Sequence, residues 1–180
     1  FPNELFKWNP PYQNQAEVHY DFFYDELQGL GLSISPSMTG SLPSLALGED
    51  LDLLTRLPIQ WNGNVDDEDP GEFRDAPSSY RERADWMFHY LVRYGNNSPI
   101  NVADAKFHPQ ESPEINRGNI SYIESWNEPD KYWYGAESMF SAEEYAAMAS
   151  CDYDGHEGTV SINDAGVTHN YSLGVGQFGI

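Results

Sequence analysis

The residues best suited to chemistry form one short run, Trp126-Asn127-Glu128-Pro129, at the end of an apolar segment. Proline has no amide donor and ends a strand, so Asn127 and Glu128 are predicted to lie at its carboxyl end. In α/β folds, reactive groups gather just beyond that end of the strands. A carboxylic acid among apolar neighbours keeps its proton toward neutral pH and can donate it to a leaving oxygen. Glu128 is therefore the candidate general acid.

The neighbours of Glu128 favour a sugar as the ligand. The Asn127 amide offers two donors and an acceptor, which suit a sugar hydroxyl. The rings of Trp126, Tyr132 and Trp133 offer flat, partly apolar faces on which a pyranose can lie. Packing is the alternative interpretation for each ring, and it is the favoured one for Trp126. We take Asn127 and the three rings as candidate substrate-binding residues.

Further charged residues lie near this run. By strand alternation, Glu124 shares a face with Trp126 and Glu128. It is interpreted as an interior residue held by a hydrogen bond or an ion pair, with a second site carboxylate as the alternative. Asp130 and Lys131 are expected either to pair with each other or to contact the substrate.

The segment "DYDGHEG" places Asp152 and Asp154 at alternate positions, as a calcium loop does at its start. It lacks the third acidic position and the closing glutamate, so a glycine turn with Asx-type hydrogen bonds is favoured. Cys151 and His156 are too few to bind zinc. We expect no metal ion and no cofactor.

Periodicity and turn residues predict helices alternating with short strands, an order that implies parallel strands with helices packed outside. The expected elements are a helix over 16–30 ended by Gly29 and Gly31, a strand over 32–36, a long insertion over 38–78, a helix over 79–94 capped by Ser78 or Ser79 with Glu82, a strand over 120–126, a helix over 141–150 capped by Ser141 and Glu144, and a glycine-rich loop over 151–159.

Composition narrows the classes of partner. The 180 residues are expected to form a single domain, and an aromatic content of 14% argues against disorder. Nine basic residues against 29 acidic ones give a net charge of −20, which argues against nucleic acid and anionic membranes as partners. One cysteine, Cys151, allows no internal disulfide. The chain opens at Phe1 without a signal-like segment, so we expect it to be processed or part of a longer protein.

The motif "WNEP" at a strand end is similar to the fourth-strand signature of clan A glycoside hydrolases, which are retaining (β/α)8-barrel enzymes. Residues 17–45 resemble helix two, strand three and the following loop of family 39 enzymes. The segments "IESWNEPDKYW" and "FSAEEYAAM" are similar to agarase-like enzymes of family 86. The resemblance implies that Glu128 is the acid/base and that Asn127 binds the sugar 2-hydroxyl.

The resemblance implies a partial (β/α)8 TIM-type barrel with parallel strands and outer helices. A whole barrel needs roughly 250 residues, so the barrel is expected to be incomplete in this chain of 180. No residue matches the nucleophile that the family carries on strand seven, and a second chain or segment is expected to supply the missing half. The expected function is a secreted or periplasmic glycosidase acting on a polysaccharide or oligosaccharide, with this chain by itself expected to be inactive. The alternatives are a non-catalytic remnant that binds glycan or serves an extracellular structure and, less favoured, an acidic calcium-dependent structural protein.

Overall fold

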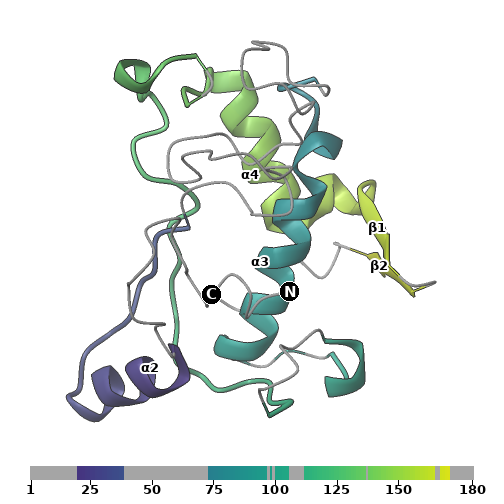
Figure 1. Cartoon of the computed structure of the whole chain (residues 1–180). Coiled ribbons are helices and arrows are strands. Elements are labelled where there is room, and N and C mark those ends of the chain that lie inside the picture. The colour runs from purple at the N-terminus through teal and green to yellow at the C-terminus, as the bar shows by residue number, and fades with distance from the viewer. Residues whose placement is uncertain are drawn as a thin grey trace, which may run out of the picture.

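The computed structural model describes residues 20–38, 73–96, 98, 100–105, 112–136, 138–164 and 167–170. Its elements are the helices α2 (Tyr20–Gly29), α3 (Arg81–Tyr94) and α4 (Ala142–Gly158), the short 3-10 helices η2 (Pro77–Tyr80), η3 (Val102–Asp104) and η4 (Tyr132–Tyr134), and the strands β1 (Ser161–Asp164) and β2 (Val167–Asn170). Helix α3 lies at the centre, with α4 packed along it and α2 near its carboxyl end (Figure 1).

Helix α3 is buried along almost its whole length, so it forms the core of the described residues. Met87 and Leu91 are fully buried, as the apolar period predicts, and so is Val92. The predicted helix over 79–94 is confirmed, but its predicted cap is wrong. Residues 77–80 form the 3-10 helix η2 instead, and the Ser79 hydroxyl donates to the Phe73 carbonyl oxygen at 2.7 Å.

The ends of the other two helices follow local sequence signals. Helix α2 ends where Gly31 takes the left-handed conformation, with φ of 75°. Helix α4 begins with the predicted capping box, in which Ser141 Oγ accepts from the Glu144 amide at 3.2 Å and the Ser141 amide donates to the Glu144 carboxylate at 2.6 Å. The loop predicted over 151–159 begins later than expected, because α4 includes residues 151–153. Residues 154–157 are non-helical, and Gly155, with φ of 67°, forms the predicted glycine turn before α4 ends at Gly158.

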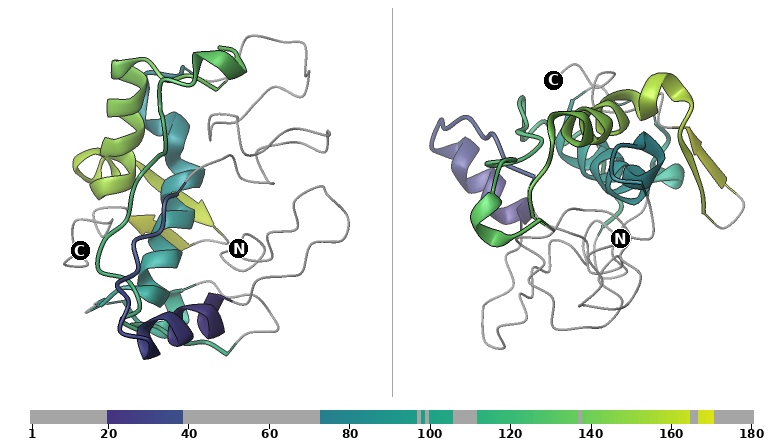
Figure 2. Two further views of the ribbon diagram at one scale, coloured as in Figure 1. Left: turned by 90° about the vertical axis from the view of Figure 1, so that its left-hand side faces the viewer. Right: turned by 90° about the horizontal axis from the view of Figure 1, so that it is seen from above.

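Two extended segments, residues 32–38 and 112–126, run beside α3 and lie next to each other (Figure 2). They meet in a parallel bridge between Ser37 and Glu124. The Met38 amide donates to Glu124 O at 2.8 Å, and the Glu124 amide donates to Pro36 O at 3.0 Å. The predicted strands over 32–36 and 120–126 are extended segments and not regular strands. A single parallel bridge joins them, between Ser37, which follows the first predicted strand, and Glu124.

The sheet that the described residues form is the antiparallel hairpin of β1 and β2. Its register pairs Ser161 with Asn170 and Asp164 with Val167. Most of the predicted insertion over 38–78 lies outside the described residues.

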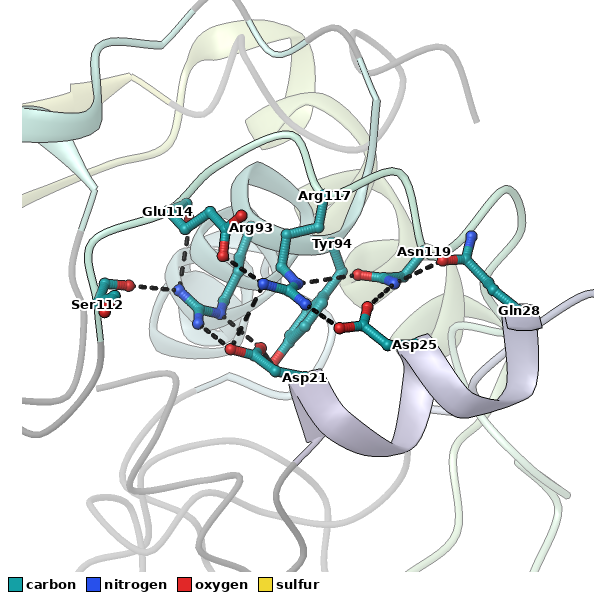
Figure 3. Close-up of polar contacts among 9 residues, drawn as sticks. All are labelled: Asp21, Asp25, Gln28, Arg93, Tyr94, Ser112, Glu114, Arg117 and Asn119. Carbon is teal, nitrogen blue, oxygen red and sulfur yellow. Dashed lines mark hydrogen bonds and ion pairs between the residues drawn. The ribbon is translucent and has the colours of Figure 1, made fainter.

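A polar network ties α2 to the carboxyl end of α3 (Figure 3). Arg93 is buried and donates through Nε to Asp21 at 3.0 Å, while Tyr94 Oη donates to the same carboxylate at 2.8 Å. Nη1 of Arg93 donates to the carbonyl oxygens of Ser112 and Glu114 at 3.1 and 3.3 Å. One guanidinium therefore fixes both α2 and the start of the second extended segment.

The network continues along the face of α2 that carries Asp21, where Asp25 and Gln28 point toward Arg117 and Asn119 (Figure 3). Asp25 accepts from Arg117 Nη2 at 2.8 Å and from Asn119 Nδ2 at 3.1 Å. Asn119 Nδ2 also donates to Gln28 Oε1 at 2.8 Å. Asp25 itself is exposed, whereas Asn119 is buried.

Replacing Asp21 tests this network. Asp21→Ala leaves the buried Arg93 charge without its carboxylate, so we expect the free energy of unfolding to fall by about 2–4 kcal/mol. Asp25→Ala removes an exposed carboxylate and is expected to lower it by less than about 1 kcal/mol. Urea unfolding of both variants measures the difference, and equal losses would contradict the assignment of Arg93–Asp21 as the stabilising contact.

The same contact predicts a pH dependence. Burial raises the pKa of Asp21, but the hydrogen bonds and charges of Arg93, Tyr94 and Arg117 outweigh it and leave the pKa below its ordinary value. A lowered pKa stabilises the fold above the unfolded value of about 3.9 and ceases to do so as the pH falls through the folded value. Urea unfolding between pH 5 and pH 2 should therefore show a loss of stability that the Asp21→Asn variant does not share.

Candidate functional site

Asn127 and Glu128 project from the turn that follows the second extended segment, and both are exposed. Trp126, just before them, is buried, with 7% of its surface exposed. Glu128 holds φ of 49°, in the left-handed region that residues other than glycine rarely adopt. The following Pro129 disfavours helical conformations at Glu128 as well. The surrounding contacts must therefore hold this backbone in place.

One anchor of the turn lies after Glu128. The Phe140 amide donates to the Pro129 carbonyl oxygen at 2.8 Å. The Phe140 ring meets the Trp126 ring edge to face, with centroids 5.2 Å apart and planes at 87°. Phe140 thus contacts the residues on both sides of the Asn127–Glu128 pair.

The other anchor precedes Trp126 and is a group of four residues that we name the Arg83 cluster: Arg83, Asp152, Ser125 and Met38. Arg83 of α3 donates through Nη2 to the carbonyl oxygens of Met38, at 3.0 Å, and of Ser125. Its Nε donates to Asp152 Oδ2 of α4 at 2.9 Å, and the Ser125 hydroxyl donates to the same oxygen at 3.2 Å. The Arg83 guanidinium also lies 5.2 Å from the centroid of the Trp126 ring.

The Arg83 cluster is buried. Arg83 and Asp152 expose 1% and 4% of their surfaces. Burial raises the pKa of Asp152, and the Arg83 guanidinium and the Ser125 hydroxyl offset part of that effect. Arg83 was not among the predicted site residues, and Asp152 was considered only as part of a candidate calcium loop. The two residues are 69 positions apart and share no motif, so the sequence gives no signal of their contact.

The aromatic residues after the motif lie in η4 and face solvent. Tyr132 and Trp133 expose 74% and 51% of their surfaces, and the next residue, Tyr134, is also exposed. The rings of Tyr132 and Trp133 meet at 80°, with centroids 5.2 Å apart. They therefore offer separate faces rather than one flat platform. Tyr134 was not among the predicted site residues, although the run "YWY" in the sequence would have indicated it.

The neighbouring charges differ in part from expectation. Glu124 has an exposed side chain, and its backbone forms the bridge to Ser37, so the predicted interior position is wrong. Lys131 is buried, but within the described residues it forms no ion pair with Asp130. Glu128 is exposed and lacks the apolar enclosure that the sequence predicted.

The candidate calcium loop is organised by protein contacts. Asp152 is bonded within the Arg83 cluster, and Asp154 Oδ1 accepts from the Glu157 amide at 2.8 Å, an Asx-type bond as the favoured interpretation predicts. His156 Nδ1 lies 2.9 Å from Ser150 Oγ. Within the described ranges, no three metal-binding side chains come together. No helix in those ranges has the length and apolar character needed to cross a membrane.

Comparison with protein-family models, curated proteins and solved structures gives no match. The resemblance to clan A glycoside hydrolases therefore stays an expectation from the sequence motif. The geometry by itself offers an exposed carboxyl group and an exposed amide on a turn anchored at both ends, followed by three exposed aromatic rings. Such a set can donate a proton, bond to hydroxyls and stack against apolar ring faces.

The left-handed backbone of Glu128 gives a test of the turn. Glu128→Gly removes the steric penalty of a side chain at positive φ, so we expect the free energy of unfolding to stay unchanged or to rise by up to about 1 kcal/mol relative to Glu128→Ala. The free energy of unfolding of Glu128→Val is expected to be about 1 kcal/mol lower than that of Glu128→Ala, because a β-branched residue tolerates the left-handed region least. Thermal unfolding ranks the three variants, and a glycine variant less stable than the alanine variant contradicts the assigned conformation.

Proposed function

We propose that this chain is part of a glycoside hydrolase that cleaves O-glycosidic bonds in a polysaccharide or oligosaccharide outside the cytoplasm. The observation that carries the proposal is the exposed Asn127–Glu128 pair at the end of an extended segment, anchored on both sides. The parallel bridge between Ser37 and Glu124 is compatible with neighbouring strands of a partial (β/α)8 barrel. In such a barrel, catalytic groups lie at this end of the strands.

In this proposal, Glu128 protonates the glycosidic oxygen as the bond to the sugar breaks, and later removes a proton from the attacking water. Asn127 bonds to a sugar hydroxyl, and Trp133 and Tyr132 stack against sugar rings. A retaining mechanism also needs a nucleophilic carboxylate about 5–5.5 Å from the acid/base. We assign that role to no residue of this chain and propose that a second chain or segment supplies it.

The alternative proposal is glycan binding without catalysis. The observation that favours it is the exposure of Glu128, because an enclosed carboxyl group is better suited to hold a proton near neutral pH. Sugar binding by the wild-type protein without turnover of any glycoside supports this alternative.

The role of Glu128 is tested through the leaving group. Glu128→Gln cannot donate a proton, so we expect kcat/KM to fall by about 10²–10⁴ for glycosides with alkyl or sugar leaving groups. The dinitrophenolate leaving group needs little protonation, so kcat/KM for dinitrophenyl glycosides should fall much less. Rates for a panel of glycosides, measured in both proteins, give the comparison. An equal loss for all leaving groups contradicts a general-acid role.

The stacking role of Trp133 is tested by binding. Trp133→Ala should weaken oligosaccharide binding about 2- to 12-fold, the effect of losing about 0.5–1.5 kcal/mol of ring contact. Tyr153→Ala is the matched control, because this α4 residue exposes 58% of its surface, close to the 51% of Trp133. Isothermal titration with agarose, xylan and cellulose oligosaccharides measures both variants. Equal affinities in the two variants contradict the assignment.

A further inference from the structure

Arg83 contacts both extended segments, 32–38 and 112–126, as far as the structure describes them. It donates to Met38 O and to Ser125 O, directly beyond the parallel bridge of Ser37 and Glu124. A guanidinium is planar and holds its donors in a fixed fork, so two carbonyl oxygens bonded to it keep a set separation. The residues that follow Ser125 are those of the candidate site.

Asp152 completes the arrangement from α4. Its Oδ2 accepts both from Arg83 Nε and from Ser125 Oγ, so Ser125 is held through its carbonyl and through its hydroxyl. Asp152 Oδ1 is buried and has no hydrogen-bond partner among the described residues.

Energetics argue that the pair has a role other than stability. Burying an ion pair removes two charges from water, and replacing such a pair by apolar residues of similar volume is often neutral or stabilising. What an apolar replacement cannot supply is the directional bonding to Ser125 and Met38. Conformational specificity at this one turn is therefore the property that Arg83 and Asp152 provide.

We propose that Arg83 and Asp152 are positioning residues that set the turn carrying Asn127 and Glu128 relative to the preceding extended segments; their catalytic consequence rests on the proposed function. They act through Ser125 and do not touch the sugar. A general acid works only within hydrogen-bond reach of the leaving oxygen, and a displacement of about 1 Å lowers a rate by as much as 10²-fold. Their loss should therefore lower kcat and leave KM nearly unchanged.

The test uses two matched double variants of the full chain. The clamp variant, Arg83→Met with Asp152→Asn, removes both charges of the pair and keeps the side-chain volumes similar. The control variant, Arg93→Met with Asp21→Asn, removes the other buried guanidinium of α3 and its carboxylate in the same way. Both variants lose one buried ion pair of the same helix, so their thermal unfolding is compared first.

Amide hydrogen exchange then reports position without any substrate. In the clamp variant, the amides of Met38 and Glu124, which form the bridge, should exchange at least 10-fold faster, whereas those of Asn119 and Ile120 keep their protection. In the control variant, the amides of Asn119 and Ile120 should exchange faster and those of Met38 and Glu124 should keep their protection. The reason is that Asn119 and Ile120 donate to Tyr94 O, beside Arg93. Unchanged exchange at Met38 and Glu124 in the clamp variant overturns the proposal.

Turnover separates positioning from a general structural role. We expect kcat in the clamp variant to fall 10- to 100-fold with KM within about threefold of wild type, and both values to be nearly unchanged in the control variant. Equal losses in both variants overturn the proposal. If the native protein, isolated together with the chain or segment that completes its site, does not turn over dinitrophenyl glycosides, the proposed function fails, and the exchange experiment still decides whether the pair holds the turn.

Ser125→Ala is the second variant, in case the clamp variant does not fold. It removes only the hydroxyl bond to Asp152 and keeps the ion pair. We expect Met38 and Glu124 amides to exchange about threefold faster, with the unfolding temperature nearly unchanged. Exchange identical to wild type in this variant overturns the part of the proposal that assigns Asp152 a role at Ser125.

Discussion

The described part of this protein depends on one requirement, that the carbonyl groups of two extended segments find donors where no continuous ladder supplies them. The bridge of Ser37 and Glu124 supplies donors to the carbonyl oxygens of Pro36 and Glu124, and backbone carbonyl groups elsewhere in the segments need other donors. Helix α3 meets the requirement with a buried arginine near each end. Arg83 bonds to Met38 O and Ser125 O, and Arg93 bonds to the backbone near residue 112.

Each arginine is balanced by an aspartate from another helix, so the same contacts hold the three helices together. Asp21 of α2 faces Arg93, and Asp152 of α4 faces Arg83. The chain has a net charge of −20 and only nine basic residues. Two of these, Arg83 and Arg93, pair with Asp152 and Asp21, which would otherwise be acids without a partner inside the protein. The central position of α3 and the location of the candidate site both follow from this arrangement (Figure 1).

The candidate site combines an anchored backbone with exposed polar side chains. Trp126 and Phe140 are packed behind the turn, whereas the side chains of Asn127 and Glu128 extend into solvent. The positive φ of Glu128 concentrates strain at the residue proposed to carry the proton, as strained backbone often does at functional sites. Residues outside this turn must therefore enclose Glu128 and the substrate, and the proposed partner segment would supply them.

Sequence alone determined the features that short-range contacts decide. The period of α3, the Ser141–Glu144 box and the Gly31 stop act within a few residues of each other, and all three are present as predicted. The motif around Glu128 could also be recognised from the sequence, because its residues are consecutive. Tertiary structure alone decided that Asp152 pairs with Arg83, that Glu124 faces solvent and that Glu128 is left-handed. The physical reason is that these outcomes depend on contacts between residues as many as 69 positions apart. Such long-range contacts produce no periodic pattern in the sequence.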